Sequence, residues 1–124
     1  MALSSFEELI VWQKSMDLVV TIYKLTESFP RAELFGLTSQ MRRSAVSIPS
    51  NIAEGSKRGT RKDFRSFLLN AYGSSAELTT QIKIAKRIHL ASDANFTEAE
   101  GLLDEIMGML NKMSTSLQTT NYKL

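Results

Sequence analysis

Apolar residues recur with a helical period between residues 37 and 58. Every third or fourth position there is apolar, namely Leu37, Met41, Ala45, Ile48 and Ile52. Because an α-helix has 3.6 residues per turn, this spacing places all of them on one face. No segment of the sequence alternates with a period of two, the pattern of a half-buried strand. The chain is thereby restricted to helices that bury one face against each other.

A second stripe, made of polar residues, follows the same segment. At about 100° per residue it lies about 120° around the helix from the apolar face. A face that only contacts water needs no such order, so we expect these groups to bond to one another or to a ligand. The stripe consists of Gln40, Arg43, Ser47, Asn51, Glu54 and Arg58.

The same periodicity extends over most of the chain and predicts four helices. The 124 residues fit one domain, 1–124. The joints are short, which favours antiparallel neighbours. The sequence therefore predicts an all-α, antiparallel up-down-up-down four-helix bundle, with residues 119–124 expected to fray. The predicted helices span about 5–29, 37–58, 61–90 and 97–118.

Three short polar patterns mark where these helices should begin. Each pairs a Ser or Thr with an acidic residue three positions later, as in a capping box. They are Ser5 with Glu8, Thr60 with Asp63, and Thr97 with Glu100.

Pro49 and two glycines stand inside the predicted helices. Pro49 removes a backbone donor, so we expect a bend there. Gly73 and Gly108 each cost roughly 1 kcal/mol relative to Ala in a helix. We interpret them as points where a neighbouring helix, of this chain or another, approaches closely; the alternative is a glycine tolerated on the surface.

Catalytic and metal-binding residues are scarce. The chain has no Cys and a single His, His89, so neither a Cys-based nor a His-based metal site is expected, and no cofactor. Glu54 and Glu77 could meet between helices as a carboxylate pair for acid–base chemistry, but a salt bridge from Glu54 to Arg58 explains Glu54 more simply. No apolar run approaches 18 residues, and no secretory signal is present at the N-terminus. We expect a non-enzymatic, cytoplasmic protein.

Positive charge is concentrated in one part of the sequence. Residues 42–65 have a net charge of +5, whereas the whole chain has only +2. A local concentration of this kind attracts polyanions such as RNA or DNA; the alternative is a solvated turn that only aids solubility. The residues predicted to contact phosphates are Arg42, Arg43, Lys57, Arg58, Arg61, Lys62 and Arg65.

The apolar residues exceed what one buried face per helix requires. Such a surplus indicates burial on a second side, and hence a homo-oligomer. The surplus residues are Ile10, Val11, Leu18 and Ile22 in the first helix and Val46, Pro49 and Ala53 in the second.

The block from Gln40 to Gly55 resembles the four-helix bundle proteins named after open reading frames in the intervening sequences of bacterial 23S rRNA genes. The likeness extends to Phe6-Glu7-Glu8-Leu9, Val11-Trp12-Gln13-Lys14 and Phe29-Pro30, and onward through Asp63-Phe64 and Gly73-Ser74. One departure is Ser44, where the family usually has Ala. The resemblance implies a ring, typically a homopentamer with a central channel. It also implies kinship with the accessory variability proteins of diversity-generating retroelements, which bind a reverse transcriptase and nucleic acid.

Several residues carry the family motif and are expected at subunit contacts or along the channel. They are Gln40, Arg43, Ser47, Pro49, Asn51, Ala53, Glu54, Gly55, Gly73, Ser74 and Glu77.

Two functions remain open at this point. In the first, a non-catalytic homo-oligomer binds RNA or DNA, or a nucleic-acid-handling protein such as a reverse transcriptase, through the basic surface. In the second, the protein is a structural or protein-interaction adaptor without nucleic-acid binding. The striped face would then dock a partner helix.

Overall fold

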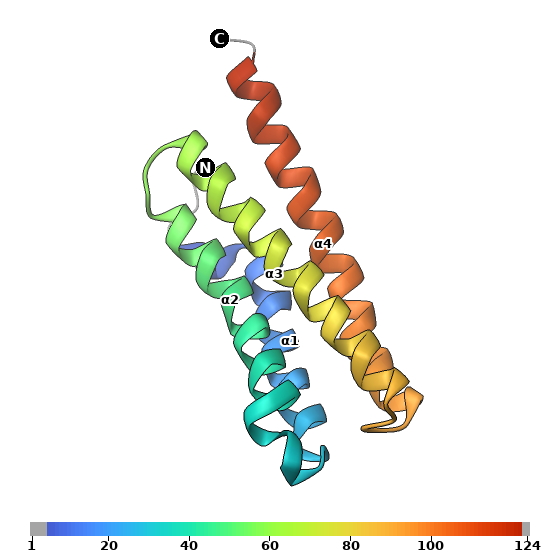
Figure 1. Ribbon diagram of the computed structural model, residues 1–124. Coiled ribbons are helices and arrows are strands. Elements are labelled where there is room, and N and C mark those ends of the chain that lie inside the picture. The colour runs from blue at the N-terminus through green and yellow to red at the C-terminus, as the bar shows by residue number, and fades with distance from the viewer. Residues whose placement is uncertain (1–4, 123–124) are drawn as a thin grey trace.

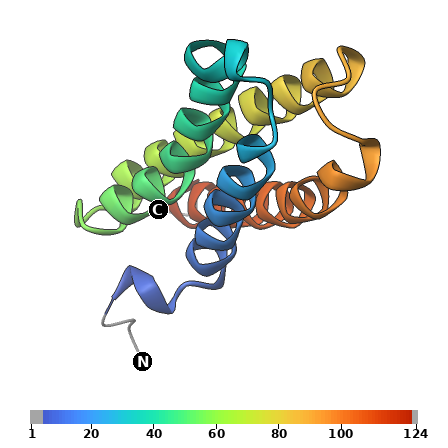
Figure 2. The same ribbon diagram turned by 90° about the horizontal axis from the view of Figure 1, so that it is seen from below.

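The computed structural model describes residues 5–122, with side chains up to residue 118, and within this range it contains helices and no strand. The chain passes along the bundle four times in alternating directions, and each helix packs on the next (Figure 1). α1 also contacts α4, which closes the bundle (Figure 2). The predicted all-α four-helix bundle is confirmed. Its helices are α1 Ile10–Glu27, α2 Ser39–Ser56, α3 Arg61–Arg87 and α4 Asp93–Tyr122.

The start of α1 differs from the predicted capping box. Ser5 does act as a cap, but its hydroxyl accepts a hydrogen bond from the backbone N–H of Glu7, at 3.1 Å. This bond begins a 3-10 turn over Phe6–Glu8, and the α-helix starts only at Ile10. The first helix therefore starts later than expected.

α4 is longer at both ends than predicted. It begins at Asp93, so Thr97 lies inside the helix and does not cap it. Glu100 instead accepts a hydrogen bond from the Lys86 ammonium group, at 3.0 Å. The helix continues through residues 119–122, which we expected to fray, and residues 123–124 lie outside the described range.

The entry to α2 is irregular, whereas Pro49 does not interrupt it. A 3-10 turn at Arg31–Glu33 and a π-helical turn at Leu34–Thr38 precede α2, with a break in the helical dihedral angles at Gly36. α2 then continues unbroken through Pro49, which is buried. Pro49, where we expected a bend, therefore neither ends nor divides the helix.

The core lies along the bundle axis and draws on every helix. The apolar stripe of α2 is fully buried from Met41 to Ile52, as predicted. Removing such side chains from water contributes about 25 cal/mol per Å² of apolar surface and drives the packing of the helices. Other fully buried members are Leu18, Ile22, Leu68, Leu78, Phe96, Ile106 and Leu110.

Much of the apolar surplus belongs to this core. Val11, Leu18, Ile22 and Pro49 are buried within the chain itself, so they give no reason to expect a second copy. The helical spacing alone underestimated how much of α1 is covered by α2 and α4 together. Only Ile10 and Val46 of the surplus remain strongly exposed.

Within residues 5–122, no helix combines the length and the apolar character that a membrane span requires.

Candidate nucleic-acid interface

The joint between α2 and α3 brings five of the seven predicted phosphate-binding residues to one end of the bundle, which the C-terminal end of α4 shares (Figure 1). Gly59 has a φ of +88°, a conformation that favours glycine, and so permits the sharp reversal of the chain. Thr60 then caps α3, because its hydroxyl accepts from the backbone N–H of Asp63 at 3.1 Å. This predicted cap is confirmed.

Three cations at this joint are exposed and unpaired. Lys57, Arg61 and Lys62 make no ion pair with an acidic residue of the described chain, and neither does Asp63 in the same turn. Lys57 only approaches the ring of Phe6, at 6.0 Å from the centroid. The amide groups that open α3 add partial positive charge at the same place. We call these three residues the basic end.

Arg58 and Arg65 are already engaged within the chain. Arg58 donates to the Glu54 carboxylate at 2.8 Å, the salt bridge that the sequence suggested. Arg65 donates to the backbone carbonyl of Ser114 at 3.1 Å and to the side-chain carbonyl of Gln118 at 3.2 Å. Arg65 therefore joins α3 to α4, and Arg58 contributes less free charge than the sequence implies.

Arg42 and Arg43 do not belong to the same surface. Arg43 precedes Lys57 by fourteen helical residues, or about 21 Å at 1.5 Å per residue. Arg42 is tied to α1, since it donates to the Thr26 hydroxyl at 2.9 Å and lies 4.5 Å from the centroid of the Tyr23 ring. Arg43 is exposed and makes no ion pair with the described residues. The seven predicted contacts are thus divided between two places.

The polar stripe of α2 lies along the seam with α3, where several of its groups bond to one another. The hydroxyls of Ser47 and Ser74 are hydrogen-bonded at 2.9 Å. Asn51 donates from its amide to the Ser47 backbone carbonyl at 2.8 Å and to the Ser47 hydroxyl at 3.0 Å. These motif residues therefore align two helices of the same subunit. Gln40 and Glu77 are exposed, with no side-chain bond to the described residues.

The structure does not bring Glu54 and Glu77 together. Because α2 and α3 are antiparallel and Ser47 faces Ser74, Glu77 lies opposite Ser44, ten residues from Glu54. That separation is about 15 Å along the helix. A catalytic carboxylate pair is therefore not formed. Within the described residues, no group of three or more His, Asp or Glu side chains is placed to hold a metal ion.

The close helix approach occurs at Gly55 and not at Gly73 or Gly108. A Cβ atom at Gly55 would lie 2.6 Å from the Cβ of Phe67. At Gly73 and Gly108, the space where a Cβ would stand is open to 4 Å. Close packing inside the subunit at those two glycines was a wrong prediction.

A hollow of about 490 Å³ near the end of α1 was not foreseen. Phe35 is 94% exposed there, although no periodic pattern in the sequence marks it. Its position just before a helix break, with Leu34 beside it, was the available clue. We call its large hydrophobic residues the apolar patch: Tyr23, Leu34, Phe35 and Val46. Arg42 and Arg43 also line this hollow.

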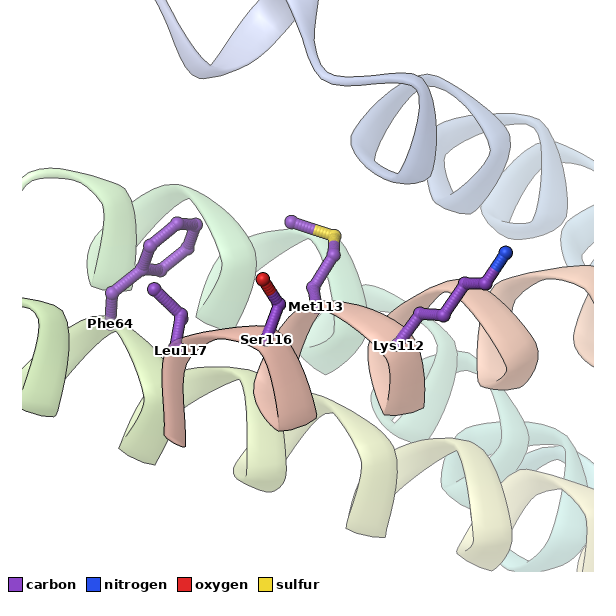
Figure 3. Close-up of a pocket in the computed structure, with 5 residues that line it drawn as sticks. All are labelled: Phe64, Lys112, Met113, Ser116 and Leu117. Atoms are coloured by element: carbon purple, nitrogen blue, oxygen red, sulfur yellow. The ribbon is translucent and has the colours of Figure 1, made fainter. Parts of the chain in front are cut away.

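A second hollow, of about 420 Å³, opens between α3 and the C-terminal half of α4 (Figure 3). Phe64 comes from the first turn of α3, while Lys112, Met113, Ser116 and Leu117 come from α4. We call it the α3/α4 hollow.

These features define an all-α bundle with a hydrogen-bonded polar seam and an unpaired basic end. The model of the family described as "23S rRNA-intervening sequence protein" matches residues 7–112, and the chain belongs to this family. The resemblance inferred from the block at Gln40 to Gly55 is thereby confirmed.

A solved structure shares the fold. It is the crystal structure of a protein with unknown function from the S23 ribosomal protein family of Bacteroides thetaiotaomicron VPI-5482. The TM-score is 0.76 at 24% sequence identity, over 85% of this chain and 98% of that chain. At this identity the likeness shows the fold alone. No curated protein matches the chain.

Proposed function

We propose that this protein is a non-catalytic, self-associating bundle that binds RNA or DNA through its basic end. The observation that carries the proposal is the exposure of Lys57, Arg61 and Lys62 and their lack of ion pairs within the described chain. All three are exposed, lie within six residues of one another across a tight turn, and form no ion pair with a described acidic side chain. Binding a polyanion there would release the counterions that otherwise accompany the phosphates.

The proposed contact is electrostatic and gives little specificity for the nucleotide sequence. Ammonium and guanidinium groups on a turn reach phosphate oxygens, which are the same at every nucleotide. Arg58 stands at the margin, because half of its side chain is exposed although it is paired with Glu54. Arg43 would contact nucleic acid only if the ligand, or an assembly of subunits, spans the distance along α2.

Replacing the basic end tests this function. The variant Lys57→Ser/Arg61→Ser/Lys62→Ser should lose most binding to RNA and DNA in a gel-shift series at two salt concentrations. With three phosphate contacts gone, the slope of log K against log salt should decrease by about 2 to 3.

A matched control removes the same charge elsewhere. Lys24, Lys83 and Arg87 are also exposed and free of ion pairs with the described residues. Their triple Ser variant should bind nearly as well as the wild type. Equal binding by the two triple variants would contradict the basic end as the binding site.

Self-association belongs to this proposal and is supported by the apolar patch. Met16 and Val20 precede Tyr23 at helical spacing and are 41% and 52% exposed, so they extend the patch along α1. Large exposed apolar surfaces of this kind mark interaction sites. A second copy of the chain is the partner we propose, in the homopentameric ring that the family resemblance implies.

An adaptor without nucleic-acid binding is the second candidate. It is favoured by the engagement of Arg42, Arg58 and Arg65 within the chain, which reduces the free positive charge. In that case the apolar patch holds a protein partner. A wild-type protein that shifts neither RNA nor DNA at low salt would favour the adaptor.

A further inference from the structure

The α3/α4 hollow has an apolar interior beside the proposed nucleic-acid surface. Phe64, Met113 and Leu117 project into it from two helices (Figure 3). All three are only partly buried although they pack against the core. Its volume of about 420 Å³ falls in the range of roughly 300–1,000 Å³ that is typical of small-molecule sites.

Positive charge stands at the edge of this hollow. Lys112 lines it and is exposed, without an ion pair to the described residues. Arg61 precedes Phe64 by three residues, so it lies on nearly the same side of α3, about 60° away around the axis. An occupant that combines an apolar ring with negative charge would suit both the walls and the rim.

We propose that the α3/α4 hollow receives an unpaired base of single-stranded RNA or DNA, stacked against Phe64, while the adjoining phosphates contact Arg61 and Lys112. This inference rests on the proposed function, because it places the base beside the basic end. It goes further by naming the ligand class, since the binding of phosphates alone does not distinguish single strands from duplexes.

The composition of the hollow favours a base over the alternatives. In a duplex, both faces of each internal base are already stacked, so these bases are not free to stack on Phe64. In a single strand the bases are free to stack on aromatic side chains. The apolar face of a partner helix by itself would bring Lys112 and Arg61 no negative charge. A single-stranded nucleic acid satisfies the ring, the apolar walls and both cations together.

The experiment compares fluorescently labelled single-stranded and duplex oligonucleotides of one sequence by anisotropy. Two substitutions act on the hollow without removing charge. Phe64→Leu keeps an apolar side chain but loses the aromatic face, and Ser116→Leu narrows the space. Asn111→Leu, on the outer face of α4, is the matched control. Light scattering on each variant reports its oligomeric mass.

The wild type should bind the single strand more tightly than the duplex. Phe64→Leu and Ser116→Leu should each weaken single-strand binding about 5- to 100-fold, the range expected for one lost base stack. Duplex binding by these variants should be almost unchanged, and so should single-strand binding by Asn111→Leu.

Four results would overturn the inference. Equal binding of both ligands, or unchanged single-strand binding by both hollow variants, would show that no base binds in the hollow. The basic end would remain a polyanion site. A change of oligomeric mass in Ser116→Leu would instead assign the hollow to a second copy of the chain. Binding of neither ligand by the wild type would end the proposed function as well.

Discussion

At the scale of single residues, Gly55 marks a close approach between α2 and α3. A methyl group added there would lie 2.6 Å from the Phe67 Cβ, which belongs to a half-buried residue of the facing helix. Neither backbone can yield easily, because Ser47 and Ser74 hold the same two helices together two turns away. The seam therefore requires a residue without a side chain at position 55.

Gly55→Ala should lower the free energy of unfolding by about 1–3 kcal/mol, the usual cost of overpacking. Gly73→Ala is the control, because it gains helix propensity of up to about 1 kcal/mol and meets open space in the subunit. Urea denaturation measures both. Equal stabilities of the two variants would contradict the close approach at Gly55. A loss of stability in Gly73→Ala that depends on protein concentration would instead place Gly73 between copies.

Residue partners were predictable only where they are near in sequence. The bond between Arg58 and Glu54 joins positions four apart, and the stripe pattern indicated it. Arg42 and Arg65 bond to groups 16 and 49 positions away, so their engagement depends on how the helices pack. A count of basic residues could not separate them from Lys57, Arg61 and Lys62.

At the scale of helices, the sequence predicted the number and type of elements better than their ends. The apolar stripes are long and regular, and every helix they indicated is present. The pattern at Thr97 and Glu100 failed as a start because α4 already begins at Asp93, and in its first turn the backbone N–H of Asn95 donates to the Ser92 carbonyl at 3.0 Å. The same kind of pattern at Thr60 succeeded because Gly59, with its positive φ, reverses the direction of the chain directly before it.

The cap at Thr60 offers a test at this scale. Thr60→Ala removes the acceptor for the Asp63 backbone N–H and should cost about 1 kcal/mol of stability. Thr60→Ser retains the hydroxyl and should lose much less. Thermal unfolding followed by circular dichroism compares them. A Thr60→Ser variant as unstable as Thr60→Ala would show that the methyl group matters and the cap does not.

At the scale of the whole molecule, the apolar patch predicts where copies meet. Phe35→Ser should lower the oligomeric mass measured by light scattering, because its 94% exposed ring is the largest uncovered contribution to the patch. The helical content should not change, since this ring supports no part of the described core.

Leu69→Ser is the control for that experiment. Leu69 is 43% exposed and lies on α3, away from the patch. Its replacement should leave the mass unchanged. Dissociation by Leu69→Ser and not by Phe35→Ser would move the contact between copies to the outer side of α3.

The closure of the bundle by α1 and α4 also determines when the fold can be completed during synthesis. α2 and α3 each pack against the helix made just before them, but one flank of α1 is covered only by α4, the last 30-residue helix of the described chain. A nascent chain emerging from the ribosome can assemble α1, α2 and α3 early, and part of α1 must stay exposed to water until α4 has been synthesised. Truncations that remove α4 would therefore yield a three-helix fragment with exposed apolar surface, which chaperones would bind.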